Sequence, residues 1–277
     1  MATEMSTLFF SAIGDLRVHP VRKWIRATVG SRTVVDTRRA RLVWEPRRVV
    51  ASYAVPEDDL AGTLAPASAP GTPATERPVS LEEGPPVLDP STPFAAHTAA
   101  GTTLSIRTPD GDLPVAAFRP DDPDLAGYVI LDWAAFSQWY EEDEPVMGHP
   151  HDPFDRIDCL RSSRRVQIGS QGVILADSTR PTLLFETPLP TRFYLPREDV
   201  ALDLLERSET QTVCAYKGRA SYWSAHVGDT VLDDIAWTYP DPLHDAAPVR
   251  DLIAFFTERL DLTLDGVLQP RPSTPWS

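Results

Sequence analysis

The sequence has few of the features that usually reveal an activity. Its only two cysteines, Cys159 and Cys214, are too few for a disulfide framework or a four-cysteine zinc site. No apolar stretch approaches the roughly twenty residues that span a bilayer, and the first twenty residues lack the basic start and apolar run of a signal peptide. None of the motifs G-x-S-x-G, Walker A, G-x-G-x-x-G or H-E-x-x-H occurs. We therefore expect a cytoplasmic protein without a metal or other cofactor, outside the common hydrolase, NTPase, dinucleotide-binding and metalloprotease classes.

Positive charge is also scarce, because 40 acidic residues face 26 basic ones and the formal net charge is −14. A protein that binds nucleic acid needs a concentrated basic surface. The two arginine clusters, within residues 38–48 and 161–165, are short and flanked by predicted strands. We expect a small molecule of unknown identity as the partner, and neither nucleic acid nor a membrane.

Proline, by contrast, is abundant, with 28 among 277 residues, roughly twice the usual share. Proline interrupts long helices and is tolerated in turns and at strand edges. The predicted fold class is therefore mainly β with a few helices, an α+β protein.

The same order of short motifs occurs twice along the chain. Asp36 and Arg39 in the first half match Asp177 and Arg180 in the second. The other matched segments are 29–31 with 168–170, 44–45 with 185–186, 55–60 with 195–200, and 97–101 with 214–218. We predict two tandem copies of one domain, over residues 16–146 and 147–266, and a disordered tail over residues 267–277. Residues 61–93, rich in Ala, Pro, Ser and Thr, are predicted to be a flexible insertion in the first copy.

One helix is predicted near the end of each copy. Five apolar residues of the second copy follow the spacing of one buried helical stripe: Val249, Leu252, Ile253, Phe256 and Leu260. Pro248 suits the first turn of such a helix. The matching residues of the first copy are Ile130, Trp133 and Ala134. Each copy is thus predicted to be a bent antiparallel sheet with one C-terminal helix.

The second copy resembles a bacterial family called domain of unknown function 427. The resemblance is carried by YLPREDV at 194–200, CAYKGRASYW at 214–223, AWTYPDP at 236–242, and the approach HPHDPFDRID at 149–158 followed by Ser162-Ser163-Arg164. It covers roughly residues 148–266 and implies a β-tent-like fold in tandem, with a degenerate first copy. Some proteins of similar fold carry zinc on paired C-x-x-C motifs, which this sequence lacks, so zinc is not expected. The resemblance implies a fold and no activity.

The strongest candidate site surrounds Lys217. Residues 220–227 are predicted to form a strand on which Tyr222 and Trp223 point to opposite faces. A lysine beside Tyr216 and partly removed from water would have a lowered pKa and act as a base or nucleophile. A solvated lysine in a turn is the alternative.

Cys214 is a second candidate nucleophile, provided that His226 or Lys217 lies close enough to activate it. A small buried side chain is the alternative. The first copy has His97 at the predicted position of Cys214, Ala100 at that of Lys217, and Ser105-Ile106 at that of Tyr222-Trp223. Side chains needed only for folding would persist in both copies, so the difference favours a site in the second copy, with the first as a structural partner or lid.

Other candidates lie around the same predicted strands. Arg197 would bind a carboxylate or phosphate through two hydrogen bonds, Glu198 would assist catalysis, and Asp199 would cap the following turn. His151 would act as a general acid–base because histidine titrates near neutrality, or else lie in a surface linker. The remaining predicted ligand-binding residues are Tyr194, Trp237 and Arg164; for the tryptophans, core packing is the alternative.

Three functions stay open at this point. The first is a small-molecule-binding domain whose pocket in the second copy is lined by Tyr194, Arg197, Tyr216, Tyr222, Trp223, Trp237 and Arg164. The second is an enzyme of acyl- or group-transfer type that uses Lys217 or Cys214, assisted by Glu198 or His151. The third is a protein-interaction module with residues 61–93 as a tether.

Overall fold

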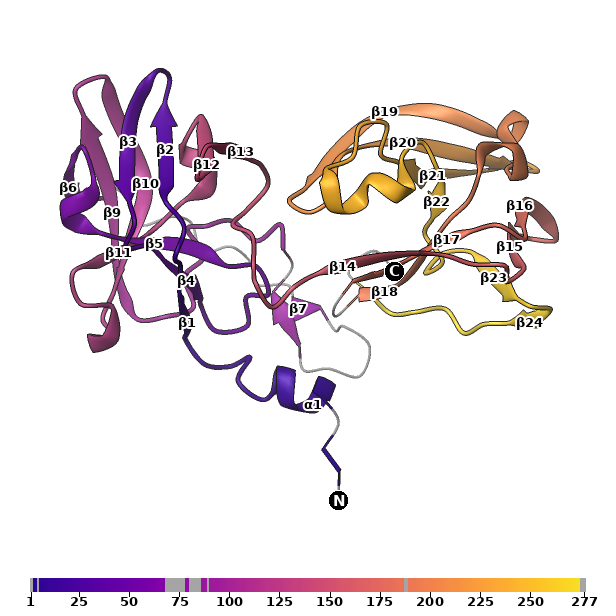
Figure 1. Cartoon of the computed structure of the whole chain (residues 1–277), viewed down its shortest axis with the longest axis horizontal. Helices are drawn as coiled ribbons and strands as arrows, with labels where there is room; N and C mark the ends of the chain where they lie inside the picture. Colours follow the sequence, from indigo (N-terminus) through magenta and orange to yellow (C-terminus); the bar gives the residue numbers. More distant parts are fainter. Residues whose placement is uncertain are drawn as a thin grey trace. The chain divides into compact units, whose positions relative to one another are not determined.

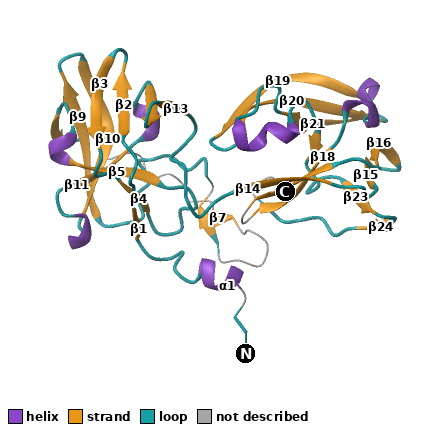
Figure 2. Ribbon diagram, in the orientation of Figure 1, coloured by secondary structure: helices purple, strands orange, loops and turns teal. Residues whose placement is uncertain are grey.

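The structure is a computed structural model that describes residues 2–3, 5–67, 78–79, 86–88, 90–186 and 189–274. The chain divides into two compact units, residues 1–152 (unit 1) and 153–277 (unit 2). Both consist of antiparallel strands joined by turns and a few short helices (Figures 1 and 2). This confirms the predicted mainly β class. Within the described ranges, no helix is long and apolar enough to cross a membrane.

Unit 1 contains a seven-stranded and a four-stranded sheet. The larger sheet has the order β1 (Arg17–Pro20), β4 (Arg41–Trp44), β5 (Ser52–Pro56), β11 (Tyr128–Leu131), β10 (Gly111–Pro120), β9 (Gly101–Thr108) and β6 (Thr63–Pro66). The smaller has the order β13 (Glu144–Val146), β12 (Gln138–Glu141), β2 (Ile25–Val29) and β3 (Arg32–Thr37). The short elements are α1 (Met5–Phe10), the pair β7 (Pro78–Val79) and β8 (Val87–Leu88), and the 3₁₀ helices η1 (Glu57–Asp59), η2 (Pro123–Leu125) and η3 (Trp133–Ala135).

Unit 2 contains three main groups of strands. They are β14 (Ile157–Arg161), β17 (Thr182–Glu186) and β18 (Leu189–Tyr194); then β19 (Leu205–Cys214), β20 (Gly218–Val227), β21 (Thr230–Thr238) and β22 (Ala254–Phe255); and then β16 (Val173–Ser178), β15 (Val166–Ser170), β23 (Asp261–Leu264) and β24 (Val267–Leu268). Two hydrogen bonds between Leu195 and Ile253 join the first group to the second. The 3₁₀ helices are η4 (Arg197–Asp199), η5 (Leu202–Leu204) and η6 (His244–Val249).

Alternation along the strands of unit 2 separates two apolar clusters. The predicted strand at 220–227 is β20, and its Trp223 packs with Ile168 and Phe255 in the larger core. The neighbouring Tyr222 packs with Trp237 in a second cluster. Because successive side chains of a strand point to opposite faces, β20 contributes to both clusters.

The α-helix predicted over residues 249–260 is wrong. The 3₁₀ helix η6 ends at Val249, Asp251 has a left-handed φ of 59°, and residues 254–255 form β22. Val249, Ile253 and Leu260 are buried as expected and the other two apolar side chains are partly buried. The backbone between them, however, hydrogen-bonds to Leu195 and to β21. In unit 1, Ile130 lies in β11, and Trp133 and Ala134 lie in the 3₁₀ helix η3. Sheet pairing thus overrides a pattern that is ambiguous over so short a segment.

The segments predicted to be a flexible insertion and a disordered tail are described only in part. Within 61–93, residues 63–66 form β6 and residues 87–88 are buried in β8; residues 68–77, 80–85 and 89 lie outside the described residues. In the tail, residues 267–268 form β24, and the hydroxyl of Thr274 donates to Glu258 at 2.7 Å. Residues 275–277 lie outside the described residues. The division between units falls after residue 152, so the segment 149–152 belongs to unit 1.

Unit 1 has a buried carboxylate at the end of β12. Glu141 accepts hydrogen bonds from Tyr53 Oη at 2.7 Å and the His151 amide at 3.1 Å, and it pairs with Lys23 Nζ. The His151 ring lies 3.6 Å from the same carboxylate. Burial opposes ionisation, but His151, Lys23 and Tyr53 outweigh it and lower the pKa of Glu141 to about 2.

Glu141 is therefore expected to contribute stability that depends on pH. The pKa falls from 4.5 to about 2 on folding, so the contribution is complete above pH 4.5 and is lost as the pH falls toward 2. Glu141→Gln should lower the free energy of unfolding at pH 7 by on the order of 2–3 kcal/mol, and the gap to wild type should shrink between pH 5 and pH 3. Urea unfolding at several pH values measures it, with the exposed Glu144→Gln as control. A gap that does not depend on pH would contradict the assignment.

Candidate functional site

A tight turn places Lys217 inside unit 2. Three residues, 215–217, connect β19 to β20, and Gly218 follows them with a φ of 97°. This left-handed conformation suits glycine. The Asp241 carbonyl oxygen and the Leu243 nitrogen lie 3.4 Å from the position of a side chain at Gly218, and the Leu243 amide donates to the Lys217 carbonyl at 3.1 Å. The turn is thus covered by the chain that leads into η6, and Lys217 is turned inward.

Inside the unit, Lys217 Nζ pairs with the carboxylate of Glu186, the last residue of β17. Only 10% of the lysine side chain and 8% of the glutamate side chain are exposed. Burial opposes the charge on Lys217, but Glu186, followed by Cys214 and Tyr194, outweighs it and raises the pKa of Lys217. The lysine is therefore held as an ammonium group. The sequence analysis predicted a lowered pKa for Lys217, which a role as base or nucleophile requires. The structure gives the opposite direction.

Aromatic side chains pack beside this ion pair. Tyr194 is fully buried, and its hydroxyl accepts a hydrogen bond from Trp237 Nε1 at 3.0 Å, with the two rings almost perpendicular. The Tyr239 ring centre lies 6.5 Å from that of Tyr194. Burial raises the pKa of both tyrosines, so both phenols stay neutral.

The more open side of the cluster carries Tyr222 and the two cysteines. Tyr222 is half-buried, stacks on Phe256, and shares a 2.8 Å hydrogen bond with the Thr212 hydroxyl. Cys159 and Cys214 are partly buried and pack against the same cluster. Burial raises the pKa of Cys159, whose Sγ donates to the Asp245 carbonyl at 3.7 Å.

A second buried ion pair borders the cluster. Arg192 on β18 donates two hydrogen bonds to Glu258, both at 2.7 Å, and its guanidinium lies 5.5 Å from the Trp237 ring centre. Burial opposes ionisation of Glu258, but Arg192 outweighs it and lowers the pKa of Glu258. We use "unit 2 cluster" below for Lys217, Glu186, Cys214 and the rings of Tyr194, Tyr222, Trp237 and Tyr239.

The structure therefore brings together five of the residues predicted from the sequence: Lys217, Cys214, Tyr194, Tyr222 and Trp237. Tyr216 lies in the same turn and is partly buried. The sequence analysis did not include Arg192, Glu258 or Glu186 among the predicted site residues, although it matched Glu186 with Glu45 in the repeat. A lysine predicted to be buried needs a carboxylate, and that requirement was the available signal for Glu186.

The other predicted site residues lie elsewhere. Trp223 belongs to the larger core, and the Arg197 guanidinium lies 5.6 Å from its ring centre. Glu198 is exposed and lies 3.4 Å from Arg180. Arg164 forms an exposed ion pair with Asp265 at 2.7 Å.

His151, predicted to assist in the second copy, contacts Glu141 in unit 1. No group of three or more His, Cys, Asp or Glu side chains that would hold a metal ion occurs in the described part of the chain.

Comparison with known proteins supports a family for unit 2. Residues 158–266 match the family model described as "Domain of unknown function (DUF427)". The matched range contains the whole unit 2 cluster. No curated protein matches the chain.

Removing one partner of the Lys217–Glu186 pair should destabilise the protein. Lys217→Met leaves a buried carboxylate without its counter-charge, which costs about 3–5 kcal/mol, whereas replacing both partners with apolar residues is often nearly neutral. We expect a large loss of stability for Lys217→Met in urea unfolding and recovery of most of it when Glu186→Leu is added.

Lys23→Met is the matched control, because Lys23 is 45% exposed and Glu141 keeps its other partners. Lys23→Met should lower the free energy of unfolding by less than Lys217→Met does. A Lys217→Met protein as stable as wild type, or a double variant no better than the single one, would contradict the pairing.

Proposed function

We propose that unit 2 is a small-molecule-binding domain and that the unit 2 cluster is its site. The observation that carries this is an ion pair buried against aromatic rings. A buried ion pair often stabilises a fold no better than apolar residues of similar size. Ligand sites, by contrast, combine apolar and aromatic walls with a few fixed polar groups.

The polar groups suggest what such a ligand would look like. Lys217 has three N–H donors, of which one meets Glu186, and the Tyr222 hydroxyl lies on the partly exposed side beside Cys214. Aromatic faces favour flat molecules. A small, flat molecule with acceptor groups at its edge fits this set of contacts.

The acyl- or group-transfer alternative has less support. The raised pKa of Lys217 disfavours the lysine as nucleophile, and the predicted assistants Glu198 and His151 contact Arg180 and Glu141 instead. Cys214 is the residue that such a reaction would still use. The interaction-module alternative relied on residues 61–93, most of which lie outside the described residues.

We further propose that the two units are diverged copies of one domain, the first of them degenerate. The strands of the two units have the same order. The larger sheet of unit 1, β1-β4-β5-β11-β10-β9-β6, corresponds to β14-β17-β18 followed, across the bridge at Leu195, by β22-β21-β20-β19. Its smaller sheet, β13-β12-β2-β3, corresponds to β24-β23-β15-β16. Both units also carry the same polar motif.

In unit 1 that motif is Asp59, which accepts from the Thr37 hydroxyl and from Arg39. In unit 2, Asp199 accepts from the Ser178 hydroxyl and from Arg180. Asp199, predicted to cap the following turn, thus ties η4 to the end of β16 instead.

The strand registers of the two units support shifting part of the sequence alignment between them by two residues. In unit 1, Leu104 pairs with Ala117, and in unit 2, Trp223 pairs with Ala236. When these pairs are aligned, the unit 1 residue equivalent to Lys217 is Thr98 rather than Ala100. In the same way, the residue equivalent to Tyr194 is Ala54. Unit 1 therefore has neither the lysine nor that tyrosine, but it keeps Glu45 at the position equivalent to Glu186.

Screening the full chain against a metabolite mixture by thermal shift tests the proposal. A ligand at a hundredfold excess over its Kd stabilises the folded state by roughly 2.7 kcal/mol, which corresponds to a shift of several degrees. Tyr222→Phe removes one hydroxyl and should weaken binding of a hit about tenfold, because a lost hydrogen bond leaves its partner unpaired.

Arg164→Ala is the control, because its exposed ion pair lies outside the cluster. It should leave the ligand-induced shift unchanged. Hits that respond equally to both variants, or no hit at all, would contradict the proposed site.

A further inference from the structure

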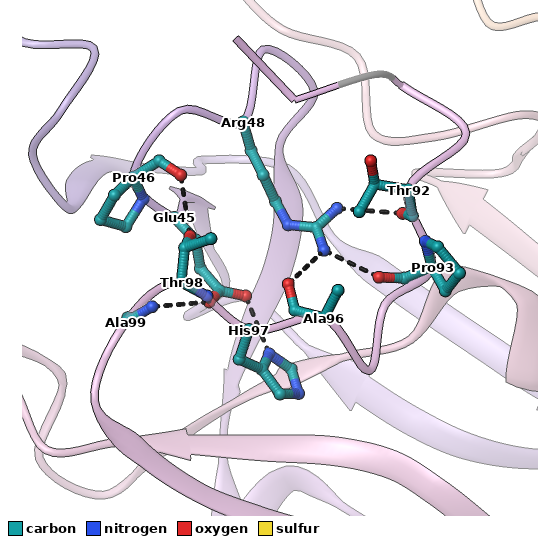
Figure 3. Close-up of polar contacts among 9 residues, drawn as sticks. All are labelled: Glu45, Pro46, Arg48, Thr92, Pro93, Ala96, His97, Thr98 and Ala99. Atoms are coloured by element: carbon teal, nitrogen blue, oxygen red, sulfur yellow. Dashed lines mark hydrogen bonds and ion pairs between the residues drawn. The ribbon is translucent and has the colours of Figure 1, made fainter. Parts of the chain in front are cut away.

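Unit 1 contains a buried polar pair of its own. Glu45 follows β4, and its carboxylate accepts hydrogen bonds from His97 Nδ1 at 3.0 Å and from the amides of Thr98 at 2.8 Å and Ala99 at 3.1 Å (Figure 3). The side chains of His97 and Glu45 are 8% and 4% exposed. Burial opposes ionisation, but His97, Ala99 and Thr98 outweigh it and lower the pKa of Glu45. Glu45 is therefore a carboxylate.

An ionised Glu45 fixes the position of one hydrogen on the imidazole. A carboxylate only accepts hydrogen bonds, so His97 Nδ1 carries a hydrogen and donates it. In the neutral ring, Nε2 is then an acceptor. Nε2 is buried and has no hydrogen-bond partner within the described part of the chain. A buried polar atom without a partner is unfavourable and calls for an explanation.

The surroundings of His97 favour a positively charged donor. The ring stacks on Phe118 at 3.7 Å between centres and meets the edge of Phe94 at 4.9 Å. Asp132 interacts electrostatically with His97; burial raises the pKa of Asp132, while the Ala134 amide and His97 oppose the rise. Two carboxyl groups thus interact with one imidazole, in a chain of net charge −14.

An arginine close to this pair donates its hydrogen bonds to the backbone. Arg48 donates to the carbonyl oxygens of Thr92 at 3.2 Å, and of Pro93 and Ala96 at 2.8 Å each (Figure 3). These bonds hold the loop over residues 92–99, which carries Phe94 and His97. Arg48 also interacts electrostatically with Glu45, and among the described residues no cation is hydrogen-bonded to Asp132.

We propose that unit 1 binds a small primary ammonium ion at His97 Nε2, with Asp132 as its counter-charge. An ammonium group has three N–H donors and a positive charge, which match one imidazole acceptor and one carboxylate. His97 and Asp132 supply two ligands, fewer than the three or four protein ligands of most zinc sites. The proposal concerns unit 1 alone and does not depend on the site in unit 2.

Nitrogen NMR of the full chain with ¹⁵N-labelled histidine tests it. His97 should show the tautomer protonated at Nδ1, and butylammonium should shift the Nε2 signal. Tetramethylammonium has the charge without the N–H donors, and butanol has a donor without the charge, so both should leave Nε2 unchanged. A hydrogen on Nε2 in the free protein, an equal response to either control, or a response to zinc but not to butylammonium would overturn the proposal.

Variants locate the site. His97→Phe keeps a ring between Phe94 and Phe118 but removes Nε2, and it should weaken butylammonium binding about tenfold or more in calorimetry. Asp132→Asn keeps an acceptor for the Ala134 amide and should weaken binding severalfold. Asp122→Asn makes the same change at the N-cap of η2 and should have no effect. Equal affinity in all three variants would overturn the proposal.

Discussion

A carboxylate at the end of an inner strand is costly to bury unless a counter-charge or several hydrogen-bond donors compensate it, and much of unit 2 follows from how Glu186 obtains a counter-charge. Lys217 reaches it only because the β19–β20 turn folds inward. The turn needs Gly218 at a positive φ, and the Leu243 amide fixes its backbone. One ion pair thus ties together β17, the hairpin and the chain leading into η6, and it sets the polar edge against which the aromatic rings pack.

Unit 1 solves the same problem with different groups. Glu45 is satisfied by His97 and two backbone amides, so the carboxylate needs no lysine and the chain around it takes another path. The imidazole that replaces the ammonium has a second nitrogen, which the described residues leave without a partner. If the units are diverged copies, loss of the lysine exchanged one kind of polar site for another, and unit 1 is more than a structural support.

The sequence predicted the mainly β class and the strand that carries Tyr222 and Trp223, because alternation along a strand is a local property. It also located Lys217 in a turn. It gave the wrong direction for the pKa of Lys217, because the deciding partner, Glu186, lies 31 positions away. The sequence analysis grouped Arg164 and Glu198 with Lys217 because they lie in or near the same family motifs. In the structure, Arg164 pairs with Asp265 and Glu198 pairs with Arg180. Long-range pairing, rather than local pattern, decides which of these side chains meet.

The chain has only two lysines, Lys23 and Lys217, and each pairs with a buried glutamate. Their settings differ in how many partners the glutamate has. Glu141 also binds Tyr53 and the His151 amide, so its lone pairs are largely used and the pair serves the fold. For Glu186, the one hydrogen bond found among the described residues is that from Lys217, and the ammonium has two further N–H donors. Unused capacity at a buried, charged and aromatic position distinguishes a pair that a ligand would complete from one that is already complete.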